Sequence, residues 1–338
     1  MICVWNIIRR PAPSLALALV AGLRLFVAST VALSARSTAA AEALRPPRIL
    51  TSFLPVFSIV RQIAGDRASV ENWLPPGIDP HEFQFQPRDL RRLREADLLV
   101  IAGLGLEGWT LSQLRSAAAN PRLQLLEASR DLPDSVRITA TRSPGAKPDA
   151  PGSKDHEPPG HEHGTSGTNP HFWLDPVLVS YAVTNVLNAL VQLDPAGREV
   201  YLLNANATLA RLEALHRDFV KRLDPAKGTA FITYHDAFPY LARRYGLKLV
   251  GVVEENAAEE PSPRELAALA ATVRREKARV LFVDGQPTRL ARRLADDLGI
   301  KIVTIETLEI GPLSADAYDA GMRRNLATLQ AALVPASP

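Results

Sequence analysis

The chain has 338 residues, enough for two lobes of ordinary domain size. Its formal net charge is +3, but the first 41 residues contain four arginines and no acidic residue, so the remainder carries −1. This balance, without an arginine-rich patch interleaved with aromatics, excludes nucleic acid as an expected partner. The only cysteine is Cys3, so the rest of the chain can form no disulfide and offers a metal no thiolate.

Residues 1–41 have the composition of a secretory signal peptide. Arg9 and Arg10 precede an Ala- and Leu-rich run, and residues 39–41 are alanines of the kind found at cleavage sites. A membrane anchor is the alternative, but Arg24 interrupts the apolar run, which argues against a spanning helix of about 20 residues. We therefore expect an exported, periplasmic protein.

Residues 46–195 predict an N-terminal α/β lobe. Apolar or amphipathic segments follow one another as strand, helix, strand, helix and strand, with the second helix opened by Pro-Arg-Asp-Leu at residues 87–90. This order favours a parallel sheet covered by helices. The three predicted strands lie at residues 49–53, about 68–73 and 98–102.

Within this lobe, residues 139–170 predict a flexible loop. The segment is rich in Pro, Gly, Ser, Thr and Asp and lacks apolar periodicity. It contains His156, His161 and His163 among acidic residues. We interpret these histidines as an auxiliary site that holds a cation loosely, the alternative being a solvated linker.

Residues 196–223 predict one long connecting helix, because apolar residues recur there at steps of three and four. At about 1.5 Å per residue it would run roughly 40 Å, enough to join two lobes. An amphipathic helix of a single lobe is the alternative.

Residues 224–338 predict a C-terminal α/β lobe that repeats the order of the first. Ser262 and Glu265 form a capping box around Pro263 at the start of one of its helices. The repeat predicts two similar lobes. Its strands are expected at residues 230–234, 247–253, 280–283 and 301–305.

Three histidines in tight turns are candidate metal ligands. His81 ends a Pro- and Gly-rich turn after a strand, and His171 precedes a helix that starts near Pro176. His235 emerges at the carboxyl end of a strand, where open α/β sheets place their ligand sites. Glu306 follows the last strand in the same way, and Glu309 is a rival for this fourth position.

Three imidazoles with one carboxylate suit Zn²⁺, whereas Mn²⁺ sites tend to have more oxygen donors. The candidates lie roughly 60 to 90 residues apart, so the whole fold must bring them together. Asp175 is expected to cap the helix that follows, although it could instead accept a hydrogen bond from the imidazole of His171.

These segments resemble the solute-binding proteins of zinc and manganese ABC importers, also called the metal-binding adhesin-type family. The resemblance covers residues 49–333. It is carried by Pro-Pro-Gly-Ile-Asp-Pro-His81, Asn-Pro-His171-Phe-Trp-Leu-Asp-Pro, Tyr-His235-Asp-Ala-Phe, the helix start Glu260-Pro-Ser-Pro and the helix of residues 318–333.

The resemblance implies two lobes joined by a long helix, with one metal ion bound in the cleft between them. It implies that His81, His171 and His235 match the histidine ligands of zinc-type members, and that Glu306 matches a position where many members have Asp. The partners it implies are a membrane permease and its ATPase, with the binding protein expected to be a monomer and not an enzyme. A manganese-binding member is the alternative within the family.

Two other classes of protein remain as alternatives. A secreted zinc hydrolase would need an open coordination position and a general base, and the chain has no His-Glu-x-x-His motif. Glu82 and Asp236 neighbour two of the histidines but have no recognisable catalytic partner. An adhesion or signalling protein would use the metal only for structure, so its zinc could not be removed without unfolding.

Overall fold

The computed structural model describes residues 45–75, 77–81, 83, 87, 89–108, 111–139, 167–254 and 261–334. The expected signal peptide (1–41) and the loop histidines His156, His161 and His163 lie outside these residues and stay predictions. The chain separates into two compact units, Met1–Pro46 and Pro47–Pro338, and the second holds both sheets and all the helices of the described residues.

The first sheet has four parallel strands in the order β2-β1-β3-β4. All four residues of β3 are apolar and buried, as expected for a strand covered on both faces. The sequence alone did not predict β4. This edge strand is only partly buried, and its sequence Gln-Leu-Leu-Glu has just two apolar residues, too few for a clear strand pattern. The strands are β1 (Arg48–Thr51), β2 (Ser69–Asn72), β3 (Leu98–Ile101) and β4 (Gln124–Glu127).

The second sheet repeats this arrangement, with four parallel strands in the order β6-β5-β7-β8. In both sheets the first strand in sequence lies between the second and the third. The two similar sheets confirm the predicted fold class. The strands are β5 (Ala230–His235), β6 (Lys248–Glu254), β7 (Val280–Val283) and β8 (Lys301–Thr304).

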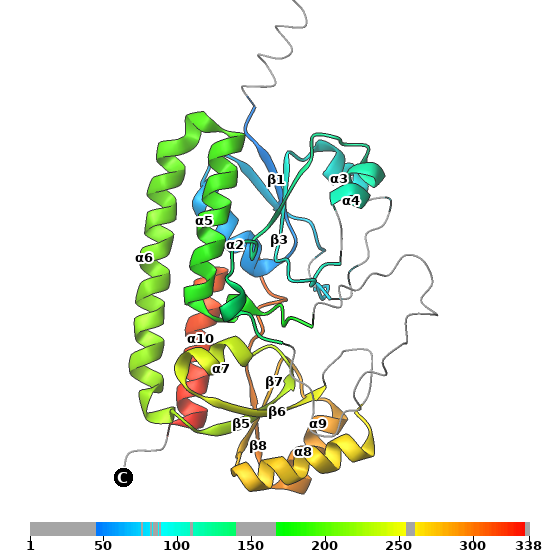
Figure 1. Cartoon of the computed structure of the whole chain (residues 1–338), viewed down its shortest axis with the longest axis vertical. Helices are drawn as coiled ribbons and strands as arrows, with labels where there is room; N and C mark the ends of the chain where they lie inside the picture. The colour runs from blue at the N-terminus through cyan, green and yellow to red at the C-terminus, as the bar shows by residue number, and fades with distance from the viewer. Residues whose placement is uncertain are drawn as a thin grey trace, which may run out of the picture. The chain divides into compact units, whose positions relative to one another are not determined.

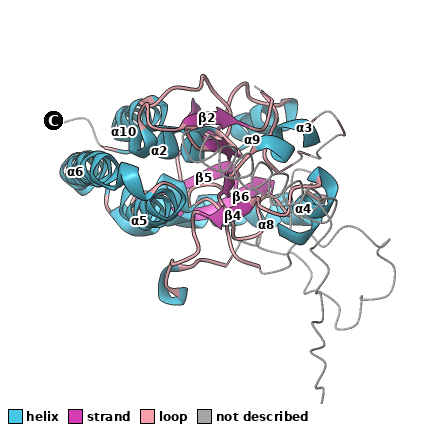
Figure 2. Ribbon diagram, turned by 90° about the horizontal axis from the view of Figure 1, so that it is seen from above, coloured by secondary structure: helices cyan, strands magenta, loops and turns pink. Residues whose placement is uncertain are grey.

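Helices lie on both sides of the strands, with α2, α5, α6 and α10 on one side and α3, α4, α8 and α9 on the other (Figure 2). The helices are α2 (Leu54–Ala64), α3 (Leu90–Glu95), α4 (Leu111–Ala118), α5 (Pro176–Leu193), α6 (Arg198–Leu223), α7 (Pro239–Tyr245), α8 (Pro263–Glu276), α9 (Arg289–Leu298) and α10 (Ala317–Leu333). Short 3₁₀ turns are η1 (Asp134–Val136), η2 (Phe172–Leu174), η3 (Pro195–Gly197) and η4 (Asp224–Ala226).

The long helix α6 has 26 residues and lies where the sequence predicts a connecting helix. It packs against α5, α2 and α10, so it contacts helices that follow β1 and β8 alike (Figure 1). By length and composition α5 could cross a membrane, but one face of it, with Leu178, Val183 and Leu190, is buried, and the helix packs against α2 and α6. α10 also packs on α2, so the C-terminal helix contacts the first lobe.

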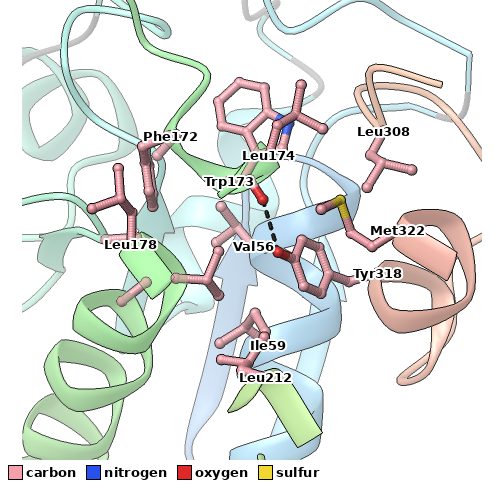
Figure 3. Packing of buried hydrophobic residues seen from close by; sticks show 14 of the residues in the cluster. Val56, Ile59, Phe172, Trp173, Leu174, Leu178, Leu212, Leu308, Tyr318 and Met322 are labelled. Carbon is pink, nitrogen blue, oxygen red and sulfur yellow. Dashed lines mark hydrogen bonds between the residues drawn. The ribbon is translucent and has the colours of Figure 1, made fainter. Parts of the chain in front are cut away.

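One buried cluster of apolar residues contains side chains from both sheets. At its centre Trp173 packs edge-to-face on Phe53, with ring centroids 4.8 Å apart. The Tyr318 hydroxyl donates a hydrogen bond of 2.8 Å to the carbonyl of Trp173 (Figure 3), whose indole donates to the Thr307 carbonyl at 2.9 Å. The segment around Trp173 is therefore fixed to both halves of the fold, and His171 lies two residues before it.

Candidate metal centre

Four side chains from separate segments converge at the carboxyl ends of the strands. His81 lies in the turn after β2, and His235 is the last residue of β5. His171 directly precedes η2, and Glu309 follows β8. His171 and Glu309 are buried, while the side chains of His81 and His235 are each 26% exposed, so the cluster is partly accessible to solvent.

The donor atoms of these residues lie close together. Nε2 of His171 is 3.0 Å from Nε2 of His235 and 3.3 Å from Nε2 of His81. Oε1 of Glu309 lies 3.0 Å from Nε2 of both His81 and His171 and 4.0 Å from Nε2 of His235. All four donor atoms lie within 4.8 Å of one another.

These separations fit a cation at the centre of the cluster. Four ligands at about 2.0–2.1 Å in a tetrahedron are about 3.3–3.4 Å apart, close to the separations of the histidine nitrogens. Neutral imidazole nitrogens at such distances direct lone pairs at one another unless a proton or a metal lies between them. Three nitrogens and one carboxylate form a donor set suited to zinc and its neighbours in the transition series.

The protonation of the cluster also suits a cation. Burial favours the neutral form of Glu309, but the close approach of Nε2 of His171 and of His81 to its carboxylate outweighs burial and holds the pKa of Glu309 well below its usual value. Burial lowers the pKa of His171, and burial with the charge of His171 lowers the pKa of His235 to about 4. Near neutral pH the site therefore has an ionised carboxylate and at least two neutral imidazoles.

His81 differs from the other two histidines. Burial lowers its pKa, but the hydrogen bond to Glu309 and the charge of Glu309 outweigh burial, so the pKa of His81 is raised above 6.5. Asp79 accepts a hydrogen bond of 2.8 Å from the backbone N–H of His81 and adds a further negative charge nearby. A proton on His81 is therefore the main competitor for a metal ion.

Glu306, the expected fourth ligand, does not lie in the cluster. Its carboxylate accepts two hydrogen bonds from Arg324, of 2.6 and 2.8 Å. Asn325 holds the backbone of the same residue, accepting from its N–H at 2.9 Å and donating to its carbonyl at 2.7 Å. Two neighbouring residues of α10 thus hold Glu306 away from the histidines, and the rival Glu309 takes the position beside them.

Two smaller expectations have mixed outcomes. Asp175 caps α5 by accepting a hydrogen bond of 3.0 Å from the backbone N–H of Val177, and it pairs with Arg244 at 2.7 Å. The acceptor beside Nδ1 of His171 is Asn169, at 3.0 Å. Asn169 was missed as a site residue, although its position two residues before His171 was visible in the motif. Glu82 lies outside the described residues.

Two parallel α/β sheets with a long helix beside them and a His₃Glu cluster between them define a metal-binding solute-binding protein. The sequence profile of the family zinc-uptake complex component A periplasmic, ZnuA, matches residues 49–332. The chain belongs to this family, which confirms the resemblance seen in the sequence. The family is one of transport binding proteins, in agreement with the expectation that the chain is not an enzyme.

Two curated relatives carry zinc in their names. The zinc-binding lipoprotein AdcA of Streptococcus pneumoniae serotype 4 is 30% identical over 287 residues, 83% of this chain and 55% of AdcA. The chain thus spans about half the length of AdcA. The high-affinity zinc uptake system protein ZnuA of Bacillus subtilis is 28% identical over 295 residues, 85% of this chain and 87% of that protein.

Solved structures of the binding protein FpvC from Pseudomonas aeruginosa have the same fold. The complex with Ni²⁺ has a TM-score of 0.72 and 26% identity and covers 87% of this chain and 100% of FpvC. The complex with Mn²⁺ has a TM-score of 0.71 and 26% identity and covers 86% and 98% of the two chains. Proteins of this fold thus occur with metals other than zinc.

Proposed function

We propose that this chain is the solute-binding component of a zinc ABC importer, with His81, His171, His235 and Glu309 as the ligands of one zinc ion. The observation that carries this proposal is the convergence of three Nε2 atoms and one carboxylate oxygen within 4.8 Å. Family membership supports the transport role. In this role Glu309 replaces Glu306 as the carboxylate ligand.

The donor set favours capture over catalysis. A catalytic zinc site keeps a coordination position open for water, whereas four protein ligands complete a tetrahedron. A hydrolase would also need a general base beside that water. Reversible capture needs neither, and the partial exposure of His81 and His235 gives the ion a path to the site and away from it.

The choice of zinc over manganese rests on the ligands. Manganese favours oxygen donors and more than four ligands, and this cluster offers three nitrogens and one carboxylate. Nickel would also bind three imidazoles in solution, because affinity follows the metal series. The complexes of FpvC with Ni²⁺ and Mn²⁺ make both metals the necessary competitors in any test.

Delivery of zinc into the cell requires a membrane permease with its ATPase and a binding protein located in the periplasm. Residues 1–41 would direct export to the periplasm, where the protein meets its membrane permease and the attached ATPase. The histidines of residues 139–170 would serve as an auxiliary, weaker collector of the same cation.

Titration of the metal-stripped mature protein with Zn²⁺, Mn²⁺ and Ni²⁺ tests this proposal. One tight zinc site is expected, lost in His171→Ala and kept in His216→Ala, a histidine on α6 whose ring faces Tyr245 instead of the cluster. Tight manganese binding with weak zinc binding would overturn the choice of metal and keep the transport role. Binding of no metal, or equal binding by the two variants, would overturn the site.

A further inference from the structure

We propose that Asn169 is a positioning residue that keeps the Nε2 atom of His171 free of its proton and holds His171 and His235 at ligand spacing. The inference rests on the proposed function, since it concerns the same site. Asn169 is 1% exposed and lies two residues before His171.

The orientation of the Asn169 amide follows from its backbone neighbours. Its Oδ1 lies 3.0 Å from the backbone nitrogen of His171, which can only donate. Its Nδ2 lies 2.6 Å from the carbonyl oxygen of Asp236, which can only accept, and 3.0 Å from Oδ2 of the same residue. Exchanging the two amide atoms would break these contacts, so Oδ1 faces His171 and Nδ2 faces Asp236.

This orientation decides the tautomer of His171. Nδ1 of the ring lies 3.0 Å from Oδ1 of Asn169, an atom that can only accept a hydrogen bond. In the arrangement that we propose the ring proton is on Nδ1 and the Nε2 lone pair is directed at the cluster, while Oε1 of Glu309 accepts a hydrogen bond from Nε2 of His81 at 3.0 Å. A ligating imidazole needs this arrangement, because the metal takes the nitrogen without the proton.

Glu309 competes for the same proton. Its Oε1 lies 3.0 Å from Nε2 of His171, so it would accept a hydrogen bond from a proton on that nitrogen. Such a proton would occupy the atom that zinc needs. When Asn169 is present, a His171 ring protonated on Nε2 has its Nδ1 lone pair facing Oδ1 of Asn169, and the two acceptors repel each other. When Asn169 is removed, this repulsion no longer disfavours the Nε2 proton.

Asn169 also sets the distance between two ligands. Asp236 directly follows His235, so the Asn169 amide joins the segment before η2 to the end of β5. The backbone of Asn169 is fixed as well, since its N–H donates to Ile138 at 2.7 Å and its carbonyl accepts from the Tyr240 hydroxyl at 2.8 Å. The close approach of the Nε2 atoms of His171 and His235 is thus prepared before a metal binds.

Three variants separate these roles from a general loss of stability. Asn169→Ala removes both the acceptor and the donor. Asn169→Asp keeps the acceptor for His171 but sets a carboxylate against Asp236. Asn120→Ala is the matched control, because Asn120 is buried, donates to the carbonyls of Leu93 and Ala96 and accepts from a backbone N–H, away from the cluster.

The experiment combines zinc titration with ¹⁵N NMR of the histidine rings in the metal-free protein. We expect the His171 proton on Nδ1 in the wild type, in Asn169→Asp and in Asn120→Ala, and on Nε2 in Asn169→Ala. Zinc affinity should fall roughly 10- to 100-fold in Asn169→Ala, less in Asn169→Asp and under about threefold in Asn120→Ala.

Two results would overturn the inference while the wild type still binds zinc. One is an Nδ1 proton on His171 in Asn169→Ala, and the other is an affinity loss no larger than in Asn120→Ala. If Asn169→Ala does not fold, Asn169→Asp decides instead. Wild-type zinc affinity in Asn169→Asp, together with the His171 proton on Nε2, would overturn the inference. Failure of the wild type to bind zinc would overturn the proposed function instead. The tautomer of His171 is measured in the metal-free protein, so that part of the inference is tested even then.

Discussion

Glu306 and Arg324 form a two-point ion pair, in which Nε and Nη2 of the guanidinium donate to the two carboxylate oxygens at 2.6 and 2.8 Å. Both side chains are partly exposed, so replacing Glu306 by Gln should change stability by less than about 1 kcal/mol. Zinc affinity should stay within about twofold of the wild type, because the residue lies outside the His₃Glu cluster.

Glu309→Gln should behave in the opposite way. The change removes the only negative charge among the four donors, so zinc affinity should fall at least about 100-fold, beyond the effect typical of residues that only support a ligand. Competition with a chromophoric chelator measures both variants. A larger loss in Glu306→Gln than in Glu309→Gln would return the ligand role to Glu306.

The sequence near the last strand does not determine which carboxylate, Glu306 or Glu309, lies beside the histidines. A carboxylate directly after a strand has the same local signal as His235, and that rule places Glu306 first. The outcome depends instead on Arg324 and Asn325, almost twenty residues further along the chain on α10. It depends too on Leu308, whose φ of 65° turns the chain. Neither feature has a local signal in the sequence.

The elements that could be predicted share one property, a strong local pattern. β3 and β7 are short runs of buried apolar residues, and α8 begins at a capping box in which Ser262 and Glu265 exchange hydrogen bonds. β4 at the sheet edge has no such run. The tight turns before His81 and His171 identified these histidines as candidate ligands. Their proximity in space depends on the packing of residues from both sheets around Trp173, which the sequence does not reveal.

Zinc binding should release about one proton in the range of roughly pH 5.5 to 7. His81 is the histidine of the cluster with a raised pKa, whereas the pKa values of His171 and His235 are lowered and Glu309 is already ionised. As the pH falls through the pKa of His81, its proton competes with zinc and the affinity should drop about tenfold per pH unit. Calorimetry in buffers of different ionisation enthalpy counts the protons. Release of three protons in this range would contradict these pKa directions.

Removing the metal should leave the fold intact. The ligands lie at the edge of the sheets, while the core is built from apolar residues that include Phe53, Trp173 and Tyr318. The far-ultraviolet circular dichroism should therefore be unchanged by a chelator. Zinc at a hundred times its dissociation constant should add about 2.7 kcal/mol to the unfolding free energy, or roughly 5–10 °C in Tm. Unfolding by the chelator would support a structural metal in an adhesion or signalling protein.

Arg244→Ala should lower stability without lowering zinc affinity. Arg244 donates at 2.7 Å to Asp175, which is 2% exposed and caps α5 at Val177. Without the guanidinium a buried carboxylate loses its charged partner, which should cost about 1–3 kcal/mol of unfolding free energy in a urea titration. The matched control is Arg217→Ala, which breaks an exposed pair with Glu213 on α6 and should cost under about 0.5 kcal/mol.

Zinc titration of Arg244→Ala then decides between the two expected roles of Asp175. If Asp175 only caps the helix, the affinity stays near that of the wild type, because the Nδ1 proton of His171 is held by Asn169. If Asp175 also orients the imidazole, disturbing its carboxylate should weaken zinc binding as much as Asn169→Ala does. Equal losses of zinc affinity in Arg244→Ala and Asn169→Ala would thus indicate that Asp175 positions His171. A loss confined to Asn169→Ala would indicate that Asn169 does so, as its hydrogen bond to Nδ1 suggests.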